Sequence, residues 1–173
     1  LAQQASLISF SLFMENNMTP EELLSLYKKI SNFDRHMGMH LTCVKQKDGG
    51  HELIYKMVIK KEHLSSPDSC HGGVLSAFMD AVLGVPVLTY AVGRDMLCST
   101  VEFKMNFLGP AKLGDVIVGK NIIDFKGKSL VVSSATLVNE VTGAQIAKGM
   151  GTFNLYPTKK RDFFNLNPKI KML

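Results

Sequence analysis

Apolar and polar residues alternate clearly at the start of the second half of the chain. In residues 101–108, VEFKMNFL, the apolar side chains fall at every second position: Val101, Phe103, Met105 and Phe107. This period of two predicts a half-buried β-strand. Further strand-like runs follow between short turn-like stretches: 116–125, 129–139 and 145–156. The second half therefore predicts four strands joined by tight turns.

The first half predicts a helix and then a hairpin. Residues 19–30 open with Thr19-Pro20, an N-cap residue followed by the residue favoured at the first helical position. Two strand-like runs then occupy residues 36–61 on either side of the turn sequence DGG at 48–50. Residues 63–73 are rich in Ser, Gly and Pro and predict a loop.

One almost wholly apolar segment, residues 73–91, separates the hairpin from the later strands. It predicts a long helix, and Pro86 inside it predicts a kink or an early end near Val85. The order is then helix, two strands, apolar helix and four strands, with links short enough for antiparallel pairing. We therefore predict an α+β fold, in which an antiparallel sheet packs on one helix.

Length and composition are those of one globular domain. The chain has 173 residues, of which 46% are hydrophobic and 20% charged. A net charge of +5 favours an anionic partner, such as nucleic acid or a phosphorylated cofactor or substrate. Nucleic acid is the weakest of these, because the sequence has no basic helix and no interleaving of aromatic with basic residues. Much of the excess charge lies in the C-terminal 15 residues, which carry five basic residues and one acid and predict a solvated tail.

The cysteines predict a reducing, cytoplasmic location. Cys43, Cys70 and Cys98 are odd in number and lack CxxC spacing, so we expect no disulfide framework. Cys70 and His71 lie near His63 and Asp68, but structural zinc ligands are usually more tightly paired, so we expect no metal. Residues 1–13 contain no Lys or Arg ahead of the apolar part, which argues against a secretory signal.

Asp80 is a lone carboxylate within the apolar segment, and three interpretations of it can be weighed. A membrane span is disfavoured, because the segment lacks basic flanks and amphipathic strands surround it. A core helix would be apolar on most sides, with Asp80 reaching solvent near one end. A catalytic helix would use Asp80 as a general base or nucleophile, because a poorly hydrated carboxylate suits both roles. Periodicity alone leaves the second and third interpretations equally open.

The catalytic interpretation makes a geometric demand. Gly72 and Gly73 would start the helix, where unpaired N–H groups and the helix dipole favour an oxyanion. Asp80 lies eight residues after Gly72, roughly 12 Å along a helix. Both groups of one chain cannot easily hold one carbonyl, so we expect Asp80 to serve the Gly72 of a second copy in a symmetric dimer.

Three segments resemble the hotdog-fold acyl-CoA thioesterases, in particular the phenylacetic-acid-degradation type with its mammalian acyl-CoA thioesterase relatives. They are HGGVLSAFMD at 71–80, STVEFKMNFLGPAKLGD at 99–115 and GAQIAKGMGTF at 143–153. The resemblance covers about residues 36–156 and implies a six-stranded antiparallel sheet wrapped around one long central helix. Residues 1–35 would then be a helical extension and residues 157–173 a basic tail. It also implies a homodimer or homotetramer, with no nucleic acid or membrane partner.

The resemblance also implies roles for single residues in acyl-CoA hydrolysis. Gly72 would polarise the thioester carbonyl, Asp80 of the opposite subunit would act as base or nucleophile, and Thr100 would position the attacking water. His71 would shape the loop, and His71, Gly73, Ser65 and Ser99 would contact the substrate. Ser99 is also the neighbouring alternative to Thr100. Ser65 stands where many relatives carry Asn, and it lacks the paired donor and acceptor of an amide. No cofactor is implied beyond the coenzyme A of the substrate.

Two other functions stay open at this stage. A hotdog hydratase would need a paired acid and histidine, and a non-catalytic acyl-CoA-binding module would be compatible with Ser65. Two sets of residues are weaker candidates for substrate contacts. The coenzyme A phosphates could be bound by Arg94, Lys126 and Lys128. An apolar acyl pocket could be lined by Phe78, Met79, Leu83 and Phe107, for which core packing is the alternative role.

Overall fold

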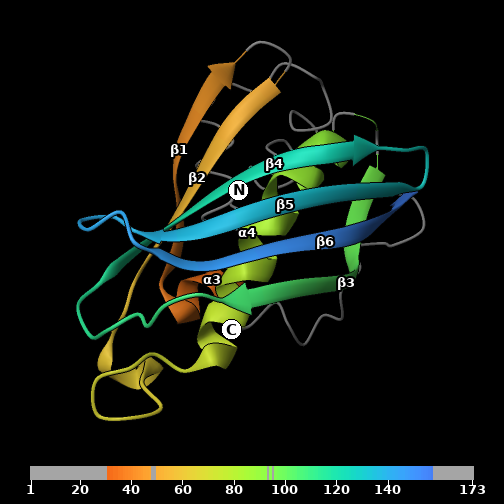
Figure 1. Cartoon of the computed structure of the whole chain (residues 1–173). Helices are drawn as coiled ribbons and strands as arrows, with labels where there is room; N and C mark the ends of the chain where they lie inside the picture. Colours follow the sequence, from red (N-terminus) through yellow and green to blue (C-terminus); the bar gives the residue numbers. More distant parts are fainter. Residues whose placement is uncertain (1–30, 48–49, 93, 95, 158–173) are drawn as a thin grey trace, which may run out of the picture.

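The computed structural model describes residues 31–47, 50–92, 94 and 96–157. The predicted helix at 19–30 and nearly all of the basic tail lie outside these residues. Within them, one antiparallel sheet of six strands wraps one long helix (Figure 1), which confirms the predicted hotdog architecture. The elements, in chain order, are α3 Asn32–Met37, β1 Met39–Lys47, β2 Gly50–Val58, the 3-10 helix η1 Lys61–His63, α4 Gly72–Val92, β3 Met96–Phe107, β4 Val116–Lys126, β5 Leu130–Asn139 and β6 Gln145–Pro157.

The strands lie in the order β1-β2-β4-β5-β6-β3, so β1 and β3 form the edges of the sheet. Neighbouring strands all pair antiparallel, as their short connections require. The first strand begins at Met39, and not at His36 as predicted, because residues up to Met37 continue the short helix α3. Ser31 caps the start of α3, and Gly38 ends it with a φ of 68°.

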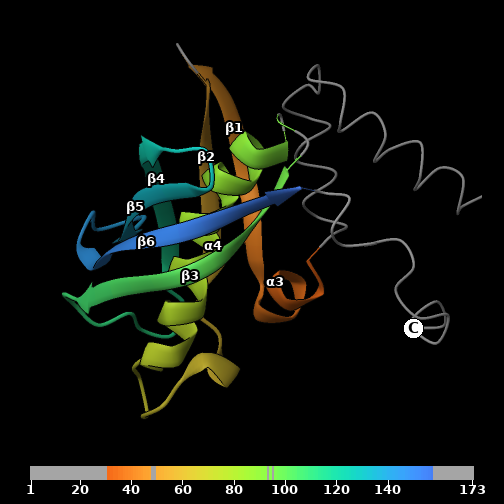
Figure 2. The same cartoon turned by 90° about the vertical axis from the view of Figure 1, so that its right-hand side faces the viewer.

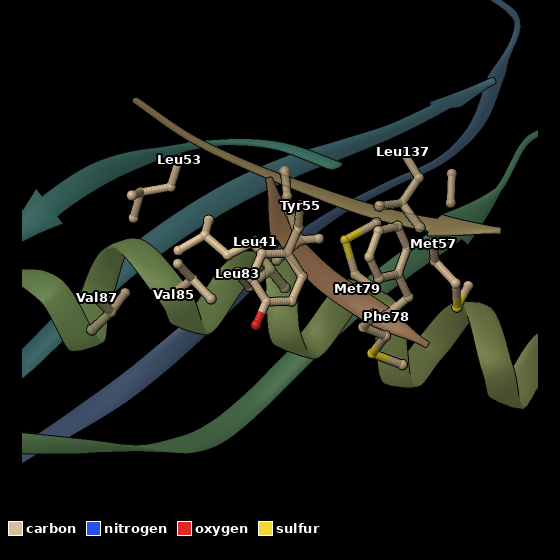
Figure 3. Packing of buried hydrophobic residues seen from close by; sticks show 14 of the residues in the cluster. Leu41, Leu53, Tyr55, Met57, Phe78, Met79, Leu83, Val85, Val87 and Leu137 are labelled. Carbon is tan, nitrogen blue, oxygen red and sulfur yellow. The ribbon is translucent and has the colours of Figure 1, made fainter. Parts of the chain in front are cut away.

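The hydrophobic core lies between α4 and the concave face of the sheet (Figures 1 and 2). Figure 3 shows side chains of α4, among them Phe78, Met79 and Leu83, packed against residues of the strands. All three are fully buried. A Cβ at Gly119 of β4 would lie 2.2 Å from Val82, so the helix approaches β4 at a distance that only glycine allows.

Helix α4 continues through Pro86 to Val92, so the predicted early end near Val85 is wrong. Hydroxyl groups support the carbonyls around the proline. Ser133 of β5 donates to the Leu83 carbonyl at 2.8 Å, and Thr89 donates to the Val85 carbonyl at 3.0 Å. Pro86 itself is buried, so packing against the sheet outweighs the cost of proline inside the helix.

By length and hydropathy alone, residues 72–91 of α4 could also cross a membrane. Half of this segment is buried inside the fold, and the core helix of a globular domain meets the same criteria.

Strand β3 departs from simple alternation. The register with β6 shifts between Thr100 and Glu102, which marks a β-bulge. Of the four apolar residues predicted to share a buried face, Phe103 and Met105 are half-buried, whereas Val101 is 59% exposed and Phe107 is 54% exposed. The prediction was therefore wrong for Val101 and Phe107, which lie at the bulge and at the strand end.

Candidate active site

Asp80 and Thr100 meet between the helix and the edge strand. Asp80 projects from α4, and the Thr100 hydroxyl on β3 donates a hydrogen bond of 2.8 Å to its Oδ1. The bulge that follows Thr100 gives this position of the strand its local geometry. The structure thus brings together two side chains that lie 20 residues apart in the sequence.

A cavity of about 530 Å³ opens beside this pair. Asp80, Thr100 and Ser99 all line this cavity. Its apolar wall comes largely from one face of α4 and from two aromatic rings: Ala77, Ala81, Gly84, Val85, Leu88, Phe103 and Phe153. The four predicted pocket residues do not line it, since three are core residues of α4 and the fourth, Phe107, lies near Gly72.

The pKa of Cys98 is affected by the burial and negative charge of this region. Burial, together with the negative charge of Asp80, raises the pKa of the Cys98 thiol to about 12. Cys98 lines the same cavity and therefore faces it as a neutral thiol near neutral pH. Cys98 is thus not primed as a nucleophile, because nucleophilic cysteines need a lowered pKa.

The start of α4 forms a second polar centre. The Gly73 N–H donates to His71 Nδ1 at 2.8 Å, so the histidine caps the helix. The Gly73 amide is therefore engaged with His71 in this structure, and its predicted contact with substrate stays a prediction. The Gly72 N–H donates no hydrogen bond to any residue that the structure describes. The ring of Phe107 lies against Gly72, 3.3 Å from the position of an added Cβ.

The loop before α4 is held by the turn at 110–115. The Cys70 N–H donates to the Ala111 carbonyl at 2.8 Å, and Ser69 forms a β-bridge with Lys112. Asp115 accepts a hydrogen bond from the Lys112 N–H and closes the turn. The sequence PAKLGD therefore fixes the position of the loop that carries His71 and Gly72.

Ser65 lies in this loop and is exposed. Its N–H donates to the Ser69 carbonyl at 3.0 Å, and it does not line the cavity beside Asp80. Its predicted contact with substrate stays a prediction.

The two polar centres do not share a cavity within one chain. Gly72 is absent from the lining around Asp80, and the eight residues between them correspond to roughly 12 Å along the helix. One chain therefore provides the carboxylate and the helix N-terminus at two separate places.

Sequence reasoning missed the polar group at another part of the cavity wall. Asp34 of α3 accepts a hydrogen bond of 2.7 Å from the hydroxyl of Tyr55 on β2. Both residues line the cavity, as does Ser31, whose hydroxyl accepts from the Asp34 N–H. The Ser31 cap and Gly38 could have predicted the short helix, but only the fold brings it to Tyr55.

Two of the three basic residues considered for phosphate binding lie together. Arg94 and Lys126 both lie over the ring of Tyr90, at 4.6 and 5.3 Å from its centroid. They mark the C-terminal end of α4, opposite to Gly72. Among the residues that the structure describes, no three His, Cys, Asp or Glu side chains form a group that could hold a metal ion.

Comparison with known proteins gives matches at the level of both sequence and fold. Residues 68–144 match the family model of the thioesterase superfamily. The human protein named acyl-coenzyme A thioesterase 13 is 29% identical over 135 residues, which are 78% of this chain and 92% of that protein.

Two solved structures share the fold. Zebra fish thioesterase superfamily member 2 superposes with a TM-score of 0.68 at 18% identity, over 81% of this chain and all of that one. The E. coli PaaI protein of the phenylacetic acid degradation operon superposes with a TM-score of 0.62 at 17% identity, over 76% of this chain and 88% of that one. The PaaI protein is thus a structural neighbour, whereas acyl-coenzyme A thioesterase 13 is similar in sequence.

Proposed function

We propose that this chain, a hotdog-fold protein of the thioesterase superfamily, hydrolyses acyl-CoA thioesters to free acid and coenzyme A. The observation that carries the proposal is the hydrogen bond between Thr100 and Asp80 at the wall of an apolar cavity. A carboxylate that is oriented by a hydroxyl and open to a cavity suits general-base chemistry. The similarity to a protein named acyl-coenzyme A thioesterase supports the choice of substrate.

In the proposed reaction, Asp80 removes a proton from water while the oxygen of that water attacks the thioester carbonyl carbon. Thr100 holds the carboxylate by its hydrogen bond to Oδ1. The negative charge that develops on the carbonyl oxygen is stabilised by the Gly72 N–H at the positive end of α4. The C–S bond then breaks, and coenzyme A leaves as a thiolate that takes up a proton.

Gly72 and Asp80 of one chain are too far apart for this step, so we propose that a second copy completes the site. The edge strand β3 supports this arrangement. Its 12 residues pair with β6 on one side, and its exposed Val101 lies next to Thr100. Pairing of two β3 edges would cover backbone groups that an unpaired edge leaves open, and would bring Gly72 of one copy toward Asp80 of the other.

The test is the release of free thiol from a panel of acyl-CoAs by the purified chain. We expect hydrolysis by the unaltered protein and a loss of about 100-fold or more in Asp80→Asn, since a positioned general base contributes about that much. Full activity in Asp80→Asn would contradict the assignment of the base. Binding without thiol release would favour an acyl-CoA-binding module. Hydration of an enoyl-CoA without thiol release would favour a hydratase, although His71 is engaged with Gly73 and does not line the Asp80 cavity.

A further inference from the structure

The cavity beside Asp80 also has a polar wall that the proposed hydrolysis does not use. That wall consists of Asp34, Tyr55 and Ser31, from α3, from β2 and from the residue that caps α3. The rest of the lining is mostly apolar and includes the small residues Ala77, Ala81 and Gly84 along α4. An acyl group whose carbonyl carbon lies near Asp80 would therefore share the cavity with apolar side chains and with a second polar group.

The polar wall has the chemistry of an acceptor site. A carboxylate can accept about four hydrogen bonds, and the Tyr55 hydroxyl supplies one to Asp34, at 2.7 Å. The Ser31 oxygen accepts from the Asp34 N–H at 3.1 Å, so its own hydrogen can be donated. Tyr55 is only 2% exposed, and Figure 3 shows it reaching from the sheet toward α4.

The charge of the lining is one-sided. Among the residues that the structure describes, the lining contains two carboxylates, Asp34 and Asp80, and no Lys, Arg or His. A carboxylate at the far end of an acyl group would therefore meet a like charge without a cation to offset it. A hydroxyl or ammonium group there would find an acceptor in Asp34, and a hydroxyl would also find a donor in Ser31.

We propose that the Asp34–Tyr55 pair selects acyl groups that carry a hydrogen-bond donor at their distal end, and disfavours acyl groups that end in a carboxylate. This inference rests on the proposed function for the reaction at Asp80 and adds the chemistry of the acyl group. A purely structural pair would fasten α3 to β2 and leave the choice of substrate unchanged.

The test compares kcat/KM for acyl-CoAs of matched length that end in a methyl, a hydroxyl, an ammonium or a carboxylate group, over a range of chain lengths. We expect the hydroxyl- or ammonium-ended substrate to exceed the methyl-ended one by about tenfold or more at the length that fits, since a hydrogen bond to a charged group is worth that much. The carboxylate-ended substrate should be the poorest. Comparing kcat/KM for the hydroxyl-ended and the ammonium-ended substrates shows whether the site prefers a neutral or a cationic donor.

Variants separate recognition from folding. In Asp34→Ala the ratio of hydroxyl-ended to methyl-ended kcat/KM should fall to about one. Asp34→Asn keeps a neutral acceptor for Tyr55, so it should lose the discrimination against the carboxylate-ended substrate and weaken the preference for donor-ended substrates. Asp124→Ala is the matched control, because Asp124 also accepts a hydroxyl hydrogen bond, from Ser134, but lies outside the cavity. This control should leave all ratios unchanged.

Non-hydrolysable thioether analogues with the same four end groups, bound to the unaltered chain and followed by calorimetry, separate this inference from the proposed function. If no thioester is hydrolysed but the donor-ended analogues bind about tenfold more tightly, the proposed function fails and the selection by Asp34 stands. If thioesters are hydrolysed with equal kcat/KM for all end groups, or if Asp34→Ala keeps the ratio of the unaltered chain, the selection by Asp34 is overturned.

Discussion

Among individual side chains, Thr100 offers a direct test of how Asp80 is oriented. Thr100→Val removes the hydrogen bond to Asp80 and keeps the branched shape, so we expect kcat/KM for thioester hydrolysis to fall by about tenfold to 100-fold. Thr100→Ser keeps a hydroxyl and should recover most of the activity. Thr152→Val is a matched control, because Thr152 donates a similar hydrogen bond to Glu102, outside the cavity. Equal losses in Thr100→Val and Thr152→Val would mean that the Asp80 contact has no special role.

Cys98 gives a prediction for the pH dependence of stability. Its pKa in the folded chain is about 12, against an ordinary value of 9.0, because of burial and the charge of Asp80. Below pH 9 both folded and unfolded chains keep the thiol proton. Above pH 9 only the unfolded chain releases it, so the free energy of unfolding falls as pH rises, by about 1 kcal/mol at pH 10 from this group.

Urea denaturation in reducing buffer at pH 8 and pH 10 measures this effect. The difference in the free energy of unfolding between the two pH values should be smaller in Cys98→Ala by about 1 kcal/mol, while groups that titrate in both proteins cancel. Identical pH dependence in the two proteins would contradict the raised pKa of Cys98.

The roles of some site residues could be predicted from the sequence, whereas the contacts of others depend on the fold. The role of Thr100 came from the resemblance alone, since no local pattern links an acid on a helix to a hydroxyl on a strand 20 residues later. The engagement of the Gly73 amide by His71 depends on a side-chain conformation that spacing alone does not fix. Asp34 and Tyr55 were missed because their contact forms only when α3 packs beside β2.

Helix α4 depends on the sheet to continue through its proline. Ser133→Ala removes the hydrogen bond to the Leu83 carbonyl, one turn before Pro86, and leaves a buried acceptor with one partner fewer. We expect the free energy of unfolding to fall by about 1–3 kcal/mol in urea denaturation. Ser134→Ala is the control, because that neighbouring hydroxyl bonds the exposed Asp124 and should cost less than about 0.5 kcal/mol. Equal costs in the two variants would show that α4 does not need the Ser133 contact.

The elements of the sheet were predictable because their alternation reflects one buried and one exposed face. The runs at 116–125, 129–139 and 145–156 each correspond to a strand within one residue at either end. The exposed Val101 and the bulge were not predictable, because a register shift depends on the partner strand and leaves no period in the sequence. The end of α4 was misjudged because the proline rule is local, whereas the compensating contacts come from β5.

For the assembled protein, the separation of Gly72 from Asp80 means that a site shared between chains can be tested by mixing. Asp80→Asn removes the base. Gly72→Pro removes the proposed N–H donor at the first position of α4, where proline is tolerated. Gly72→Ala keeps the N–H and serves as the control for crowding against Phe107, which lies 3.3 Å from an added Cβ. We expect Gly72→Pro to lose far more hydrolytic activity than Gly72→Ala.

When the two inactive variants, Asp80→Asn and Gly72→Pro, are unfolded together and refolded as a mixture, half of the dimers should contain one chain of each. In such a dimer one site receives Gly72 from the first chain and Asp80 from the second, while the other site has neither, so thiol release should recover to about a quarter of that of the unaltered protein. A site built within one chain would give no recovery, because every chain then carries a defect. Size-exclusion chromatography with light scattering should show that the mixture has the same mass as the unaltered protein, so that recovered activity reports the sharing of the site between chains.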